Sequence, residues 1–300
     1  MEVFSRVLSI FILMVVGYAA RKAKAMDQSL VRGLSGFILN VAIPFTIIVS
    51  FDRSISRSAL PDLAKIGLWA ILILGASAII ATLVYRKFPD DKRKVLSYVT
   101  VFSNCGFMGF PVAESVFGKI GVMYASIYVI VFQIFIWTYG VNLFMGKSGK
   151  SQLRQALLNP GNIAVVLGMA IWFLPFELPG AVNDSIVILS QMTTPLSMIV
   201  VGATLADIPL RGLFSGLELW IGTLVRIVVI PAALFGIMRL FGIEGLPAKV
   251  AAFLTAMPAA AQSVIFAERY GANAALASRT VFVSTVLSIL TLPVFAVLFR

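Results

Sequence analysis

Apolar runs of about 20 residues follow one another along the whole chain, and short polar stretches separate them. A helix of about 20 residues crosses the hydrocarbon core of a bilayer, so each run predicts one membrane helix. No connector is longer than about a dozen residues, which leaves no room for a separate soluble domain. We therefore predict an all-α integral membrane protein of ten transmembrane helices. These segments, numbered 1 to 10, are 4–22, 30–51, 63–85, 93–117, 120–145, 160–176, 181–206, 214–241, 247–268 and 272–299.

The composition agrees with this fold class, because 60% of the residues are hydrophobic and 12% are charged. The formal net charge of +11 would suit a nucleic acid, but the basic residues lie between apolar runs, where lipid phosphates explain them better. The chain has no histidine, and its one cysteine, Cys105, lies in segment 4. We expect a lipid bilayer around the chain and no nucleic acid, metal or cofactor.

The basic residues are divided unevenly between the two sides of the bundle. The connectors after odd-numbered segments hold 14, which are Arg21, Lys22, Lys24, Arg32, Arg86, Lys87, Lys92, Arg93, Lys94, Lys147, Lys150, Arg154, Arg211 and Arg269. The other connectors and the two ends hold 8, which are Arg6, Arg53, Arg57, Lys65, Lys119, Arg239, Lys249 and Arg300. The first run has the length of a signal-peptide core, but its basic cluster follows it, so segment 1 is expected to remain a membrane helix. The positive-inside rule then predicts a multi-pass protein of the inner cell membrane, with both termini outside the cytoplasm.

Prolines recur at an interval of five segments. Pro44 in segment 2 corresponds to Pro195 in segment 7, and Pro111 in segment 4 corresponds to Pro258 in segment 9. Five is an odd number, so the second set of helices is inserted upside down relative to the first, as in many secondary transporters. The spacing predicts an inverted repeat of two five-helix halves, residues 1–150 and 151–300. The alternative is chance, because membrane helices tolerate proline.

Segments 4 and 9 each contain a stretch that disfavours a continuous helix. Proline removes a backbone donor and glycine weakens the helical preference. Backbone groups freed by a break persist in a membrane only against protein or a polar cavity. Two breaks at corresponding positions predict crossing broken helices with a binding site at the midplane, and the alternative is a simple kink at each proline. The candidate substrate-binding residues at the breaks are Ser103, Asn104, Cys105, Pro258, Ala259 and Gln262, and the candidate helix-breaking residues are Gly106, Gly109, Pro111, Pro44 and Pro195.

Two arginines fall inside predicted spans. Arg226 lies about 16 Å into segment 8, where a charge needs a carboxylate, backbone carbonyls or a watery cavity as its partner. It is a candidate counter-charge for an anionic substrate or, alternatively, a structural arginine bonded to freed carbonyls. Arg279 is shallower, and either anion binding or snorkelling to the cytoplasmic face explains it. A hydroxyl stripe near it either lines a pathway or packs between helices, and its members are Thr280, Ser284, Ser288 and Thr291.

The acidic residues give little support to cation exchange. Glu114 and Glu268 follow the two breaks, and a position near the membrane interface explains them better than a role in ion binding. No pair of carboxylates lies at membrane depth, as exchange of a proton or metal ion would require. Neutral oxygens of Asn104, Gln262 and Ser263 remain a possible sodium site, so the coupling ion is open.

The motifs around the two breaks resemble those of the auxin efflux carrier family. They are Asn104 with Gly106, Met108, Gly109 and Pro111 in segment 4, and Ala256 to Pro258 with Phe266 to Gly271 in segment 9. Asn40 to Pro44 and Leu290 to Pro293 fit as well, so the resemblance covers nearly the whole chain. It adds Asn40 to the candidate substrate-binding residues.

The resemblance implies a fold like that of the bile-acid sodium symporters. Segments 1, 2, 6 and 7 would form a scaffold that also dimerises, and segments 3–5 and 8–10 would form a moving transport domain. Asn104 matches the asparagine at the crossover of the plant carriers, and Pro258 matches their segment 9 proline. Ser103 stands where the plant proteins have proline, and the short stretch from Gly146 to Asn159 replaces their long loop. Both departures favour a bacterial-type permease over a carrier of auxin itself.

These observations favour a secondary transporter of a small organic anion by alternating access. The substrate class is a carboxylate such as malate, malonate or an auxin-like acid. A sodium-coupled symporter and a channel are the alternatives. An intramembrane enzyme would need a nucleophile with its base or a metal pair, and the sequence offers neither. A receptor is disfavoured because no soluble output domain is present.

Overall fold

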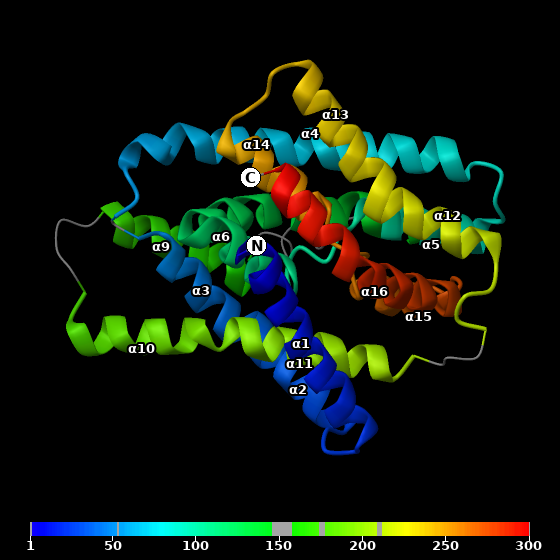
Figure 1. Cartoon of the computed structure of the whole chain (residues 1–300), viewed down its shortest axis with the longest axis horizontal. Coiled ribbons are helices and arrows are strands. Elements are labelled where there is room, and N and C mark those ends of the chain that lie inside the picture. The colour runs from blue at the N-terminus through cyan, green and yellow to red at the C-terminus, as the bar shows by residue number, and fades with distance from the viewer. Residues whose placement is uncertain (1, 53, 146–157, 174–177, 209–211, 300) are drawn as a thin grey trace.

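The computed structural model describes residues 2–52, 54–145, 158–173, 178–208 and 212–299, and within these ranges the regular elements are helices. Figure 1 shows their arrangement. The helices before residue 146 are α1 (Glu2–Lys22), α2 (Gln28–Phe37), α3 (Ile43–Ser50), α4 (Leu60–Tyr85), α5 (Asp90–Val101), α6 (Gly109–Phe135) and α7 (Val141–Met145). Those after residue 157 are α9 (Pro160–Phe173), α10 (Gly180–Gln191), α11 (Thr193–Ala206), α12 (Leu217–Leu224), α13 (Ile230–Leu240), α14 (Leu246–Thr255), α15 (Gln262–Arg269) and α16 (Ala274–Leu298).

Each of the ten predicted segments contains helix. In the part of the chain that the structure describes, six stretches are long and apolar enough to cross a membrane, namely Gln28–Ser50, Arg57–Tyr85, Gly109–Met145, Gly180–Ala206, Leu217–Leu240 and Ala274–Leu298. Pro160–Phe173 and Leu246–Thr255 are apolar but shorter. The all-helical membrane architecture is therefore confirmed for the described residues, whereas the ten-span inverted repeat stays a prediction. The boundary predicted between the two halves, at residues 150 and 151, lies outside the described residues.

Gly118 divides α6 into two helices that belong to different predicted segments. Its φ of 67° and ψ of −158° interrupt the helix inside Gly109–Phe135. A side chain disfavours this backbone conformation, and glycine adopts it without steric cost. The interruption lies between the predicted end of segment 4 and the predicted start of segment 5. The described helix thus contains the second half of segment 4 and the first part of segment 5.

Among the described residues, three π-helical turns widen the spans, and two of them end two residues before a proline. They are Ile38–Ala42 before Pro44, Ile136–Gly140, and Val225–Val229 before Pro231. Proline has no N–H and its ring crowds the carbonyl four residues earlier, so a local widening accommodates it. At Pro44 the helix is widened and continuous, so the predicted break there is wrong. Near Pro195, α10 and α11 are separated by one residue, Met192, whose backbone is still in the right-handed helical region, so the break predicted at Pro195 stays a prediction.

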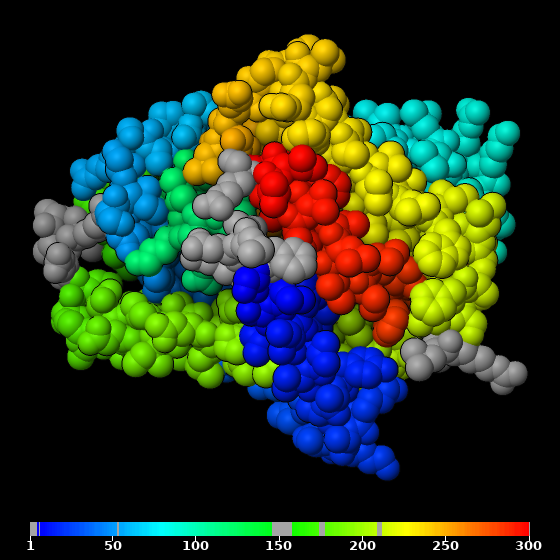
Figure 2. Space-filling view, in the orientation of Figure 1, coloured from blue at the N-terminus to red at the C-terminus, as the bar shows by residue number. Residues whose placement is uncertain are grey.

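Helices α1 and α11 pack with their backbones in contact at two glycines. A Cβ added to Gly17 would lie 2.0 Å from the carbonyl oxygen of Ile199, and one added to Gly202 would lie 1.8 Å from that of Met14. Small residues at such a crossing allow close approach, which gives helices in lipid much of their packing energy. In the space-filling view of Figure 2, α1 and α16 also lie side by side across the middle of one face.

The outer helices expose apolar side chains. Helices α4 and α10 lie along opposite edges of the molecule in Figure 1. Large apolar side chains on α4 remain exposed, among them Leu68, Ile71, Leu72, Ile79 and Leu83, and α10 has no buried residue. Apolar patches of this extent mark surfaces that meet lipid or other protein. The protein is therefore a multi-pass membrane protein whose outer face lies in a bilayer.

Candidate functional site

The two interrupted helices meet through their backbones at the breaks. Helix α5 ends at Val101 and α14 ends at Thr255, and the chain resumes helix at α6 and α15. The N–H of Asn104 donates to the carbonyl of Pro258 over 2.8 Å, and the N–H of Ala260 donates to the carbonyl of Phe102 over 3.0 Å. These bonds form an antiparallel bridge between Ser103 and Ala259. We call residues 102–108 and 256–261 together the crossing.

Backbone pairing explains why both breaks are stable inside a membrane protein. Each break frees N–H and C=O groups that hydrocarbon cannot satisfy. The pairing satisfies one donor and one acceptor from each break. The carbonyl of Asn104 accepts a further bond from the N–H of Gly109 over 3.0 Å. A Cβ at Gly109 would lie 3.1 Å from the Leu254 side chain, so glycine allows the close approach. Backbone hydrogen bonds thus join the two interrupted helices at their breaks.

Arg226 lies fully buried beside the crossing, in the π turn Val225–Val229. Its Nε donates to the carbonyl of Met257 over 3.2 Å, and its Nη1 donates to the carbonyl of Thr100 over 2.6 Å. One acceptor comes from each broken helix. Its Nη2 is buried and has no hydrogen-bond partner among the described residues. The arginine therefore binds both breaks and retains donor capacity.

Two pairs of bonded hydroxyl groups belong to residues near the two breaks. The hydroxyl of Tyr85 bonds to that of Thr100 over 2.8 Å, and the hydroxyl of Tyr128 bonds to that of Thr255 over 3.2 Å. Tyr85 and Tyr128 lie close enough to interact electrostatically with Arg226. No ion pair joins Arg226 to a carboxylate in the described part of the chain. The site thus contains a buried positive charge that is bonded to backbone carbonyls.

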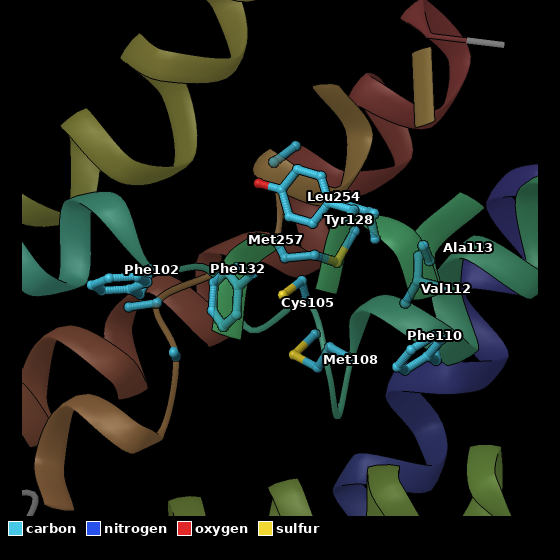
Figure 3. Packing of buried hydrophobic residues seen from close by; sticks show 14 of the residues in the cluster. Phe102, Cys105, Met108, Phe110, Val112, Ala113, Tyr128, Phe132, Leu254 and Met257 are labelled. Atoms are coloured by element: carbon cyan, nitrogen blue, oxygen red, sulfur yellow. The ribbon is translucent and has the colours of Figure 1, made fainter. Parts of the chain in front are cut away.

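Apolar side chains fill the space around the two breaks. In Figure 3, Cys105 and Met108 from the first break lie with Met257 from the second, below Tyr128 and Leu254. Cys105, Met108 and Met257 are fully buried. Flexible sulfur-containing side chains fill irregular gaps of this kind. This position makes Cys105 a packing residue on the inner side of the crossing.

Asn104 and Ser103 present polar side chains at the crossing. The amide of Asn104 has no hydrogen-bond partner in the described ranges, and the residue retains 6% of its surface exposed. The hydroxyl of Ser103 is buried and has no partner within the same ranges. Two helices begin beside these residues, α6 at Gly109 and α15 at Gln262. The start of a helix carries partial positive charge, which favours anions.

Other predicted site residues lie away from the bonded crossing. Asn40 is exposed, and its amide donates to the carbonyl of Gly36 in its own helix. Arg279 donates to the carbonyls of Gly212 and Ser215, so it fastens the stretch before α12. Among the described residues, no hydrogen bond of these two side chains reaches the breaks, so their role in substrate binding stays a prediction.

The residues predicted to hold sodium differ in whether their side chains are already hydrogen-bonded. The hydroxyl of Ser263 donates to the carbonyl of Ala260 over 2.6 Å, whereas Gln262 is half-buried at the first position of α15. Within the hydroxyl stripe, Thr280 and Ser288 bond to carbonyls of their own helix, as packed hydroxyls do. Ser284 alone of the four bonds to the crossing, since it accepts the N–H of Ala259 over 3.1 Å.

A model of the membrane transport protein family matches residues 2–155 and 147–296. The chain belongs to this family. The resemblance to auxin efflux carriers, drawn from the motifs at the two breaks, is confirmed by this match.

Relatives in this family are similar over their whole length. An "Uncharacterized transporter" of Methanocaldococcus jannaschii is 27% identical over 95% of both chains. Another of that description, from Methanothermobacter thermautotrophicus, is 29% identical over 97% of this chain and 96% of its own. A Rhizobium meliloti protein described as "Putative malonate transporter" is 22% identical over 97% of this chain and 93% of its own. The names support membrane transport as the broad role of the family member described here.

Sequence reasoning missed several residues that complete the site of this family member. Thr100 and Met257 supply carbonyls to the guanidinium. The hydroxyls of Tyr85 and Tyr128 bond to Thr100 and Thr255, one residue near each break. A carbonyl has no sequence signature, because every residue has one. The nearest signal is an arginine at membrane depth without an acidic partner, which points to freed backbone groups.

Proposed function

We propose that the protein is a secondary transporter that carries a small organic anion by alternating access at the crossing. The observation that carries the proposal is the pair of backbone bonds between Asn104 and Pro258 and between Ala260 and Phe102, at 2.8 and 3.0 Å. They bring two interrupted helices together inside a membrane protein of a transport family. Interrupted helices whose ends meet are the usual substrate sites of secondary transporters.

The chemistry at the crossing favours a negatively charged substrate. Helices α6 and α15 begin there, and the positive ends of their dipoles attract an anion. The free amide of Asn104 adds a neutral donor for a carboxylate oxygen. Nη2 of the buried Arg226 has no partner among the described residues and so remains a charged donor. A carboxylate is the proposed class, with malonate, malate and an auxin-like acid as its members to test, and the name of the Rhizobium relative supports it.

The contacts between helices support a division into scaffold and transport domains. Helix α1 packs on α11 and α3 packs on α9 and α10, which would form the scaffold from segments 1, 2, 6 and 7. Helix α4 packs on α5, α6 and α14, and α12 packs on α16, which would form the transport domain from segments 3–5 and 8–10. We propose that the ten helices form an inverted repeat and that each set combines helices from both halves of the repeat. The exposed helix α10 is available for a homodimer through the scaffold.

A ligand screen on purified protein tests the substrate class. Unfolding temperatures are measured with malonate, malate and indoleacetate, and with malonamide as an uncharged match for malonate. Each measurement is made in sodium and in choline buffers of equal ionic strength. A ligand at 100 times its Kd stabilises the folded state by about 2.7 kcal/mol, so a carboxylate should raise the unfolding temperature and malonamide should not. Equal effects of malonate and malonamide would contradict an anion site.

A saturable exchange assay separates a carrier from a channel. Proteoliposomes loaded with unlabelled malonate should take up labelled malonate faster than empty ones, because a carrier exchanges its substrate. Uptake that rises linearly with concentration and ignores internal malonate would favour a channel.

A further inference from the structure

Arg226 binds backbone carbonyls that the two helix breaks leave without a partner in their own helix. In a continuous helix the carbonyl of Thr100 would accept the N–H of Asn104, but that N–H donates to Pro258 instead. Nη1 of Arg226 takes the vacant place at Thr100, at 2.6 Å. Nε binds the carbonyl of Met257, just beyond the end of α14, at 3.2 Å. The guanidinium thus lies at the C-terminal ends of both first half-helices.

The electrostatics of this position are those of a cation site. The last carbonyls of a helix lack intrahelical partners and carry the negative end of its dipole, so they attract a positive charge. Two such ends converge on Arg226, which is fully buried. The polar side chains near it include the hydroxyls of Tyr85 and Tyr128 and the thiol of Cys105. Helix ends and freed carbonyls therefore balance the charge, as they do around the coupling ion of other broken-helix transporters.

The local sequence explains why the guanidinium reaches both ends. Pro231 cannot donate to the carbonyl of Ile227, and the π turn Val225–Val229 precedes it. The turn contains Arg226 on its buried side, while Val228 and Val229 are exposed. Nη2 keeps two N–H groups without a partner among the described residues. The guanidinium therefore occupies a position suited to a cation, and it cannot leave because Arg226 is part of segment 8.

We infer that Arg226 takes the place of a coupling cation, so that the protein binds and carries its anion without sodium. The inference rests on the proposed function, since it names the ion requirement of the same site. A tethered charge remains at the half-helix ends in every state of the cycle, whereas a free ion must enter and leave with the substrate. Gln262 and Ser263 are then not sodium ligands, in agreement with the bond of the Ser263 hydroxyl to Ala260.

Cation dependence of unfolding tests the inference without any substrate. Wild type, Arg226→Ala and Arg226→Lys are purified, and their unfolding temperatures are measured in choline chloride, sodium chloride and methylguanidinium chloride at equal, low ionic strength. Wild type should unfold at the same temperature in choline and in sodium. Arg226→Ala should lose several degrees in choline and recover at least half of the loss in methylguanidinium or sodium. Arg226→Lys should fall between the two, because it keeps the charge and loses the planar fork.

A matched variant controls for general effects of the cations. Arg279→Ala also removes a guanidinium from backbone carbonyls, but from the stretch 212–215 and not from the crossing. Neither cation should stabilise it more than it stabilises wild type. Failure of both cations to stabilise Arg226→Ala, or an equal gain in the Arg279 control, would overturn the inference.

Uptake measurements separate failure of the inference from failure of the proposed function. Wild-type proteoliposomes are tested with labelled malonate, malate and indoleacetate in sodium-free and sodium-containing buffer. Equal uptake in the two buffers supports the inference, also where Arg226→Ala fails to fold. Uptake that requires sodium overturns the inference and leaves anion transport in place. Absence of uptake of all three anions contradicts the proposed function, and the unfolding temperatures still decide whether Arg226 occupies a cation position.

Discussion

The N–H of Asn104 donates to the carbonyl of Pro258 over 2.8 Å and thereby joins two helices that are both interrupted at this point. Each break supplies a hydrogen-bond donor and an acceptor for backbone groups of the other. Pro258 has no N–H of its own, and the N–H of Asn104 would otherwise close the helix that ends at Val101. The pairing frees the carbonyl of Thr100, which Arg226 then binds. This one backbone bond thus joins the two breaks and leaves the Thr100 carbonyl free for the buried charge of Arg226.

The crossing of α1 and α11 predicts a strong effect of a single methyl group. Gly202→Ala would place Cβ 1.8 Å from the carbonyl oxygen of Met14, and backbone atoms cannot rotate away as a side chain can. We expect the two helices to separate and the free energy of unfolding to fall by about 1–3 kcal/mol. The unfolding temperature in detergent measures the loss. Gly33→Ala is the control, because a Cβ there meets no atom within 4 Å. A loss as small as that of the control would show that the helices do not touch in the native protein.

The ion pair between Asp52 and Lys119 predicts a pH dependence. Lys119 bonds to the carboxylate, and the N–H of Ser54 donates to it over 2.8 Å. The bond from Lys119 is the main cause that lowers the pKa of Asp52 from 3.8 to about 2. A folded-state pKa below the unfolded one means that the stabilisation is present above about pH 4 and is lost as the pH falls toward 2.

The Asp52→Asn variant measures this contribution. Lys119 is more than half exposed, so solvent screening limits the effect to about 0.2–1 kcal/mol at neutral pH. The difference in unfolding temperature between wild type and variant should shrink between pH 4 and pH 2, and should also shrink in high salt. Asp184→Asn, an exposed carboxylate on α10, is the control and should show neither trend. A difference that stays constant across this pH range would contradict the ion pair.

The distribution of basic residues predicts which connectors face the cytoplasm. In a Cys105→Ser background, Lys87→Cys reports on the connector between α4 and α5, and Asn183→Cys reports on the first turn of α10. Both positions are exposed, so a thiol reagent reaches them without unfolding. In intact cells an impermeant maleimide should label Asn183→Cys, and it should label Lys87→Cys only after the membrane is permeabilised. Labelling of Lys87→Cys from outside would reverse the topology.

The sequence predicted the helices and the breaks well because local chemistry determines them. Apolar runs bounded by charge locate each segment to within a few residues, and Gly106, Gly109 and Pro258 mark the breaks. The break predicted at Pro44 was wrong because a π turn absorbs the missing donor, a choice that depends on packing. The contacts of Arg226 were beyond prediction, because its acceptors are backbone carbonyls from segments distant in the chain.

The same limit applies to residues that the resemblance carried over. Asn40 matches a family motif, yet its amide bonds within its own helix. Arg279 was a candidate for anion binding from its depth alone, and its hydrogen bonds show that it fastens a nearby stretch. Gly17 and Gly202 lie in ordinary apolar runs, and only the structure reveals that their backbones meet other backbones.

The account depends most on the claim that the crossing is the anion site. Asn104→Ala removes the free amide and keeps the backbone bond to Pro258, so the fold should persist. A hydrogen bond to a charged group contributes about 1.5–3 kcal/mol, which corresponds to roughly a tenfold or greater loss of affinity. Asn183→Ala, which removes an exposed amide from α10, is the matched control.

The most direct measurement is the uptake of labelled malonate, malate and indoleacetate into proteoliposomes that contain equal amounts of wild type, Asn104→Ala or Asn183→Ala. The account predicts saturable uptake of at least one carboxylate by wild type and by the Asn183 variant. It also predicts that Asn104→Ala raises the half-saturating concentration by about tenfold or more. Uptake by Asn104→Ala that equals wild type at every concentration would contradict the claim that the crossing binds the anion.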